Sequence, residues 1–266
     1  MLYALQDKMI FPGAASRGTT DAIVKPRAGE ELVPLTTASG EKIVLLFSPA
    51  LTRDGAPHPN AKNQPTLIYF YGNGMSLNDA IYDIPRLCKH GFNVAGVEYV
   101  GYGMSTGKPG ETGIYESADA AYAHLISRSD IDKNKLIPFG CSLGGAAAIH
   151  LASTKPVLCV ATFSAFTTMP DMAQKQVPFL PARWLVKYNF DNESKIAKIT
   201  CPAFLAHGRS DTLVPFAMNA KLAAAAKVKT TVVPVQDAGH NDIFMVGGTD
   251  LLEKFAAFVG EIQTGK

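Results

Sequence analysis

Short apolar runs alternate with helix-like segments along most of the chain, and this alternation limits the possible folds more than any other feature. The runs expected to form buried strands are 41–50, 66–74, 92–101, 135–140, 157–166, 202–208 and 230–236. The segments expected to form helices are 78–91, 111–129, 143–153, 217–228 and 250–262. Strands that alternate with helices in this way predict an α/β protein, with a parallel sheet covered on both faces.

Composition is consistent with one large domain. The chain has 266 residues, of which 47% are hydrophobic, and a net charge of +2 without a long basic run. A nucleic-acid-binding surface is therefore not expected, and no apolar run approaches the roughly 20 residues of a membrane span. We expect a single domain over residues 1–266, with a small lid inserted at about 167–199 that contains the only tryptophan, Trp184.

Two segments fit the pattern Gly-x-Ser-x-Gly, which marks a nucleophilic serine on a sharp turn between a strand and a helix. The segment 140–144 has both neighbours, because Ser142 follows a predicted strand and precedes an Ala-rich helix. The segment 103–107 also follows a strand, but Pro109 and nearby glycines prevent an immediate helix. Ser142 is the predicted nucleophile, and Ser105 is interpreted as part of a structural loop.

The cysteines are isolated in the sequence and form no metal-binding pattern. They are Cys88, Cys141, Cys159 and Cys201. We interpret them as small buried side chains, with one disulfide left as an alternative. Cys141 is excluded as the nucleophile, because a cysteine at this turn would need small residues where Phe139 and Leu143 stand.

A nucleophilic serine needs a base, and the base needs an acid that orients it. With this kind of turn the chain order is serine, acid, histidine. His240 follows the last predicted strand and is the predicted base, whereas His207, at the end of its own strand, is interpreted as a packing residue. Asp211 is the predicted acid, because Asp237 and Asp242 lie too close to His240 in the sequence.

An oxyanion site needs two backbone N–H donors. The residue after the nucleophile, Leu143, is one candidate, and Asn73 in the "YGNG" loop after an early strand is the other. The neighbours of that loop, Tyr71 and Gly72, and the lid residue Trp184 are the candidate substrate-binding residues.

Four segments together resemble those of the α/β-hydrolase superfamily. They are "YFYGNG", "GVEYVGYGMSTGKPGETGIY", "GCSLGG" and "HGRSDTLVP" with its later "GH". The second segment is similar to that of a small-lidded serine hydrolase branch, which includes protein-depalmitoylating enzymes and bacterial relatives. The resemblance implies the α/β-hydrolase fold, a mostly parallel central sheet with helices on both faces and a short lid. Tyr71 stands where the branch commonly has His, and Glu98 where it commonly has Asp.

The residues and the resemblance together predict a serine carboxylic-ester hydrolase that works through an acyl-enzyme on short- to medium-chain acyl esters. One alternative is an acyl-protein or acyl-CoA thioesterase, similar to a depalmitoylase, and another is a catalytically silent binding or scaffold protein. The expected partner is a small-molecule acyl ester, and neither a metal nor a cofactor is expected.

The chain start, "MLYALQDKMIFPG", does not have the pattern of a secretory signal peptide. The sequence as given therefore predicts a cytoplasmic protein. Members of the resembled branch often carry an N-terminal anchor, and "LYALQDKMIFP" is similar to the stretch that follows one. The alternative to a cytoplasmic protein is therefore one from which an anchor or signal segment has been removed. Membrane association is expected only through such a segment, which would place the protein in the periplasm or at a membrane.

Overall fold

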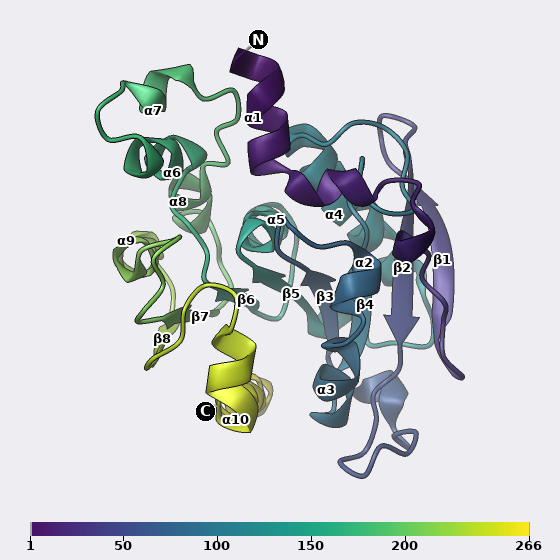
Figure 1. The fold of residues 1–266 in the computed structure, drawn as a ribbon. Helices are drawn as coiled ribbons and strands as arrows, with labels where there is room; N and C mark the ends of the chain where they lie inside the picture. The colour runs from purple at the N-terminus through teal and green to yellow at the C-terminus, as the bar shows by residue number, and fades with distance from the viewer. Residues whose placement is uncertain (1, 266) are drawn as a thin grey trace. The chain divides into compact units, whose positions relative to one another are not determined.

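The computed structural model describes residues 2–265, with the side chains of residues 6–265. The chain divides into two compact units, Met1–Pro138 and Phe139–Lys266. Figure 1 shows their helices and strands along the chain.

The first unit combines four strands with four helices. The strands are β1 (Glu31–Thr36), β2 (Lys42–Ser48), β3 (Thr66–Phe70) and β4 (Asn93–Val97), and the helices are α1 (Leu2–Ile10), α2 (Leu77–Ala80), α3 (Ile84–Lys89) and α4 (Glu111–Ser127). The strand order is β1-β2-β4-β3. The pairs β1–β2 and β2–β4 are antiparallel, whereas β3 and β4 are parallel.

Helices cover both faces of these strands. A Cβ added to Gly96 of β4 would lie 2.8 Å from Leu77 of α2, so that helix packs on this face. The preceding residue, Ala95, pairs with Phe47 of β2, and successive side chains of a strand point to opposite faces. The guanidinium of Arg128, at the end of α4, lies 4.2 Å over the Phe47 ring. The opposite face is therefore the one that meets α4.

The second unit is a parallel array with the order β5-β6-β7-β8. Its strands are β5 (Leu136–Cys141, which begins before the boundary), β6 (Val160–Phe163), β7 (Ala203–Gly208) and β8 (Thr230–Val235). Its helices are α5 (Leu143–Thr154), α6 (Met169–Gln176), α7 (Ala182–Leu185), α8 (Asn192–Ile196), α9 (Phe216–Ala225) and α10 (Ile243–Thr264).

Strand β7 is likewise covered on both faces. Phe204 contacts Phe255 and Phe258 of α10, with ring centroids 5.4 Å apart in each pair. His207 contacts Phe216 of α9 edge-on at 5.8 Å. Residues three apart in a strand face opposite sides, so α10 and α9 cover opposite faces of β7. Aromatic contacts therefore join β7 to α10 on one face and to α9 on the other.

Several sequence expectations differ from the structure in detail. The single helix expected over 78–91 is two short helices, α2 and α3, separated by a turn before Pro85. Strand β1 was not predicted, because Pro34 interrupts its short apolar pattern. Helix α10 begins seven residues before the expected segment and is broken at Gly248, where φ is +53°.

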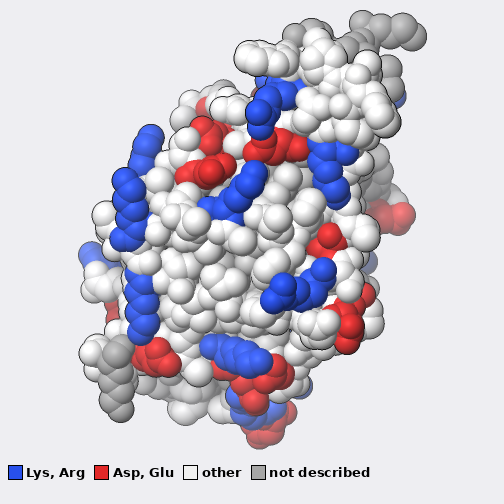
Figure 2. Space-filling view, turned by 90° about the vertical axis from the view of Figure 1, so that its left-hand side faces the viewer, with Lys and Arg blue, Asp and Glu red and all other residues white. Residues whose placement is uncertain are grey.

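The segment 167–199, for which a lid was predicted, contains α6, α7 and α8 between β6 and β7, and its role as a lid stays a prediction. No helix within residues 2–265 is long and apolar enough to cross a membrane. On the face shown in Figure 2, Lys and Arg side chains are interspersed with Asp and Glu side chains and form no continuous basic surface.

Candidate active site

Ser142 lies on a sharp turn between β5 and α5. Its backbone has φ 53° and ψ −116°, a strained conformation for a residue other than glycine. A Cβ on Gly140 would lie 2.1 Å from the carbonyl oxygen of Gly144, so only glycine fits there. The backbone N–H of Ser142 donates to the carbonyl of Phe163 in β6 at 2.8 Å. The glycine pattern of the sequence is therefore a steric requirement of this turn.

The loop that carries His240 lies directly against the end of β7. The backbone N–H of Ser210 donates to the carbonyl of Ala238 at 2.9 Å. A Cβ on Gly208 would lie 2.3 Å from the same carbonyl oxygen. Asp242 closes the loop by accepting the backbone N–H three residues before it, at 2.7 Å. Asp242, which was set aside as the acid, therefore has a structural part in shaping this loop.

The structure brings Ser142, His240 and Asp211 into one hydrogen-bonded chain. Nε2 of His240 lies 2.9 Å from Oγ of Ser142, and Nδ1 lies 2.8 Å from Oδ2 of Asp211. A carboxylate only accepts, so Nδ1–H donates to Asp211 and Nε2 is free to accept from the serine hydroxyl. The arrangement can transfer a proton from serine to histidine while the carboxylate stabilises the imidazolium.

Asp211 is buried but fully supplied with donors. Its Oδ1 accepts the backbone N–H groups of Leu213 at 3.0 Å and Val214 at 2.8 Å. Burial raises the pKa of the carboxyl, but the hydrogen bonds from His207, His240 and Val214 lower it by more. The pKa of Asp211 is therefore well below its ordinary value. The carboxylate is therefore charged at neutral pH.

His207 is a member of this cluster that the sequence interpretation did not include. Its side chain is completely buried, and Nε2 lies 3.2 Å from Oδ2 of Asp211 and 2.8 Å from the carbonyl oxygen of Val214. Because both neighbours are acceptors, Nε2 carries the proton. His207 is therefore a packing residue, as interpreted from the sequence, and it also contacts the Asp211 carboxylate. Its position four residues before Asp211 is compatible with the contact, but spacing across a loop does not determine it, so no sequence signal indicated this role.

Asn73 lies in the first unit, in the loop after β3, where its side chain is already engaged. Its Nδ2 donates to the carbonyl of Ile10 at 2.9 Å. Its carbonyl oxygen accepts the N–H of Gly13 at 2.9 Å and the hydroxyl of Tyr102 at 3.2 Å. None of these bonds uses the backbone N–H of Asn73, the group expected to act as a donor. The other predicted donor, Leu143, is the buried first residue of α5 in the second unit.

Tyr71 is fully buried within the first unit, and its hydroxyl donates to Oε1 of Glu98. The same oxygen accepts the backbone N–H of Leu77 at 3.1 Å. Glu98 therefore connects the two ends of the segment that contains Gly72 and Asn73. Burial raises the pKa of Glu98 to about 7, although these hydrogen bonds oppose the shift.

Trp184, the lid residue expected to contact substrate, is 86% exposed. It lines a hollow of about 610 Å³ whose other walls come from α6, the segment around α8, and the end of α9. The residues of the Ser142 cluster are not among those that line this hollow.

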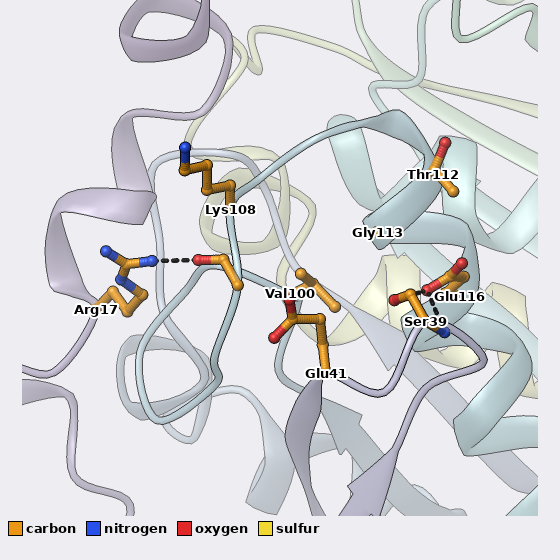
Figure 3. Close-up of a pocket in the computed structure, with 9 residues that line it drawn as sticks. Arg17, Ser39, Glu41, Val100, Lys108, Thr112, Gly113 and Glu116 are labelled. Carbon is orange, nitrogen blue, oxygen red and sulfur yellow. Dashed lines mark hydrogen bonds between the residues drawn. The ribbon is translucent and has the colours of Figure 1, made fainter.

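Ser105 is buried in a braced loop of the first unit, and its Oγ has no hydrogen-bond partner within the described residues. Gly101 donates its N–H to the carbonyl of Thr106 at 2.8 Å, and Arg17 donates to the carbonyl of Gly107. Figure 3 shows the pocket of about 540 Å³ beside this loop, with Arg17 and Lys108 at one side and Ser39 with Glu116 at the other. Within the described residues no histidine is hydrogen-bonded to Ser105, whereas His240 is hydrogen-bonded to Ser142.

Comparison with known proteins gives relatives in bacteria and in vertebrates. No family model matches the chain. The uncharacterized protein Rv2307c of Mycobacterium tuberculosis is 31% identical over 205 residues, which cover 77% of this chain and 73% of that protein. Human alpha/beta hydrolase domain-containing protein 17B is 29% identical over 227 residues, which cover 85% and 73%. The structure of Pyrococcus furiosus esterase Pf2001 aligns with a TM-score of 0.68 at 22% identity, over 88% of this chain and 90% of that one.

Proposed function

The chain belongs to the α/β-hydrolase superfamily and has an esterase-like fold, and from this premise we propose that it is a serine hydrolase that cleaves carboxylic esters. The fold class predicted from the sequence, a mostly parallel sheet with helices, is confirmed. The observation that carries the proposal is the hydrogen-bonded chain from Ser142 through His240 to Asp211.

In the proposed acylation step, Oγ of Ser142 attacks the acyl carbonyl carbon while Nε2 of His240 takes the hydroxyl proton. Asp211 keeps the imidazole in the tautomer that can accept this proton, and its charge stabilises the imidazolium that results. The tetrahedral intermediate collapses when His240 returns the proton to the leaving alcohol, and an acyl-Ser142 ester remains.

In the proposed deacylation step, His240 takes a proton from water, and the hydroxide equivalent attacks the acyl carbon. The acid then leaves and Oγ of Ser142 regains its proton. We assign an oxyanion contact to the backbone N–H of Leu143, because such a donor stabilises the charge that develops on the oxygen. The oxyanion role of Asn73 stays a prediction from the sequence. The N-terminus of α5 adds a favourable dipole at Leu143.

Short- to medium-chain acyl esters are the proposed substrates. The lid has only two short helices, α6 and α7, before α8 returns to the body of the unit. A lid of this size has little surface to enclose a long acyl chain. The same serine chemistry would cleave a thioester, so a thioesterase remains the nearest enzymatic alternative.

The test is hydrolysis of p-nitrophenyl esters from acetate to palmitate, with an acyl thioester alongside, by the wild type, Ser142→Ala and Ser105→Ala. We expect wild-type activity on the shorter esters and a fall in kcat on the order of 10⁴ or more in Ser142→Ala. Ser105→Ala is the matched control and should keep most of the activity, provided that its thermal unfolding matches the wild type.

Labelling with a fluorophosphonate gives a readout that does not depend on the substrate. Peptide mass spectrometry should locate the label on Ser142. The proposal is wrong if the wild type cleaves none of the esters or thioesters and takes up no label. A label on Ser105 would show that the nucleophile was assigned to the wrong serine.

A further inference from the structure

The lid exposes a cluster of large apolar side chains to solvent. We call this cluster the lid tip. Its members and their exposed fractions are Val177 (43%), Phe179 (97%), Leu180 (58%), Trp184 (86%) and Leu185 (44%). Burying such a side chain is worth about 1.5–3 kcal/mol, so leaving several of them in water within nine residues forgoes much stability. Contiguous exposed apolar surface of this kind indicates an interaction site.

Hydrogen bonds and one ion pair hold the lid tip in its exposed position. Nε2 of Gln174 donates to the carbonyl of Leu180 at 3.0 Å and contacts that of Pro178 at 3.3 Å. The guanidinium of Arg183 pairs with Asp171 in the first turn of α6. The backbone N–H of Asp171 donates to Oγ1 of the N-cap residue Thr168 at 3.0 Å. These bonds fix the turn between α6 and α7. The apolar side chains of the lid tip are therefore held in solvent by the local backbone structure.

The turn that carries the lid tip has cations but no acidic residue of its own, whereas Asp171, Asp191 and Glu193 line the hollow beside Trp184. From residue 172 to residue 190 the sequence contains Lys175, Arg183 and Lys187 and no Asp or Glu. Arg183 shares its charge with Asp171, Lys175 donates to the carbonyl of Leu213 at 2.9 Å, and Lys187 lies 4.8 Å over the ring of Tyr188. In Figure 2 the outer surface of the lid, at the top of the view, is white, and the charged side chains lie at its base.

This combination fits a lipid surface better than a protein partner. A stable protein interface uses about 20–30 residues from each side, and the lid tip offers five apolar side chains. A membrane interface needs only a few aromatic and aliphatic side chains beside cations, and each Lys or Arg near an anionic surface contributes about 1 kcal/mol. We propose that the lid tip docks on the surface of an anionic phospholipid bilayer, with Phe179 and Trp184 inserted at the headgroup level.

Docking through the lid tip is independent of the chemistry at Ser142, and it is also independent of any N-terminal anchor. If the proposed esterase activity holds, docking would bring the site to acyl esters that partition into membranes. The Ser142→Ala protein should bind vesicles like the wild type, so failure of docking and failure of the esterase proposal are separate results.

Trp184 is the only tryptophan of the chain, so its fluorescence reports on the lid tip alone. The experiment titrates the full chain with vesicles of phosphatidylcholine, with and without phosphatidylglycerol, and with acyl-brominated lipid as a quencher. We expect a blue shift and quenching with the phosphatidylglycerol vesicles, both weakened by high salt. Phe179→Ser with Leu180→Ser should weaken binding at least about tenfold.

The matched control is Met245→Ser with Val246→Ser, because these side chains are also exposed and apolar, 76% and 46%, but lie in α10. It should bind vesicles like the wild type. The proposal is overturned if Trp184 shows neither shift nor quenching, if the Phe179 and Leu180 double variant binds unchanged, or if both vesicle types bind equally. A blue shift that follows protein concentration without lipid, with dimers in sedimentation velocity, would instead identify a second copy of the chain as the occupant.

Discussion

At the scale of single residues, Asp211 shows what a sequence pattern can and cannot indicate. Chain order and position after a strand were enough to select Asp211 with His240, and the structure brings the two together at 2.8 Å. The same pattern could not show that His207 lies 3.2 Å from the same carboxylate oxygen. That contact depends on how the strand end curves toward the following loop, and a single sequence does not record this curvature.

Glu98 should make the stability of the protein depend on pH. Its pKa is about 7 in the folded chain and 4.5 in the ordinary case, chiefly because of burial, and Asp79 adds to the rise. The tyrosines Tyr71, Tyr99 and Tyr102 surround it. As pH rises from about 4.5 to 7, the unfolded chain ionises first, so this contribution to stability is full below pH 4.5 and is lost through pH 7.

We expect Glu98→Gln to remove this dependence. Urea unfolding at pH 5 and pH 8 should show the wild type losing about 2 kcal/mol more than the variant over that range. Tyrosine-to-glutamine hydrogen bonding can persist, so the variant should still fold. Identical pH dependence in the two proteins would show that Glu98 does not titrate as described.

At the scale of elements, local pattern predicted the order of strands and helices but not the antiparallel edge. The apolar runs matched β2 to β7 closely because buried strands are almost uniformly apolar. Strand β8 was also located, but it is an edge strand with mostly half-buried or exposed residues and not the buried strand expected. Strand β1 contains Pro34 and lacks a continuous apolar run, so its local pairing with β2 across the turn at 37–41 was not indicated by the apolar pattern. The break of α10 at Gly248 was missed because an isolated glycine within a helical pattern is tolerated in most helices.

The sharp turn at Ser142 should tolerate no Cβ at Gly140. We expect Gly140→Ala to lower the free energy of unfolding by several kcal/mol, or to prevent folding, because the added Cβ would lie 2.1 Å from a backbone carbonyl oxygen. Gly260→Ala is the matched control, since Gly260 lies inside α10 with open space around its Cβ position. That variant should gain about 0.5–1 kcal/mol. Wild-type stability of Gly140→Ala in urea unfolding would contradict the steric argument.

At the scale of the whole molecule, the sequence could predict the fold class and a consistent set of site residues. The single domain over residues 1–266, the oxyanion roles of Asn73 and Leu143, and the substrate contacts of Tyr71, Gly72 and Trp184 remain predictions. They depend on where distant segments meet, which neither propensity nor spacing determines. The catalytic roles of Ser142, His240 and Asp211 are also a proposal, which the hydrogen bonds among these three residues support.

The thiols should report on global unfolding. The four cysteines form no disulfide within the described residues, and Cys88, Cys159 and Cys201 are buried. Burial raises the pKa of Cys88 to about 12 and of Cys201 to about 11, and places that of Cys159 well above its ordinary value. Ellman's reagent should therefore react with at most one thiol of the native protein and with four in guanidinium chloride. Prompt reaction of two or more native thiols would show that the structure around the buried cysteines opens readily.

The order of Ser142, Asp211 and His240 along the chain determines when during synthesis the cluster can form. Ser142 and Asp211 are synthesised before His240, and the loop of His240 rests on the end of β7 and leads into α10. A ribosome that has not yet passed residue 240 therefore holds a chain whose serine has no base beside it. On the proposed mechanism, such a nascent chain is chemically inert toward acyl esters, and reactivity arrives only after residue 240 has been made.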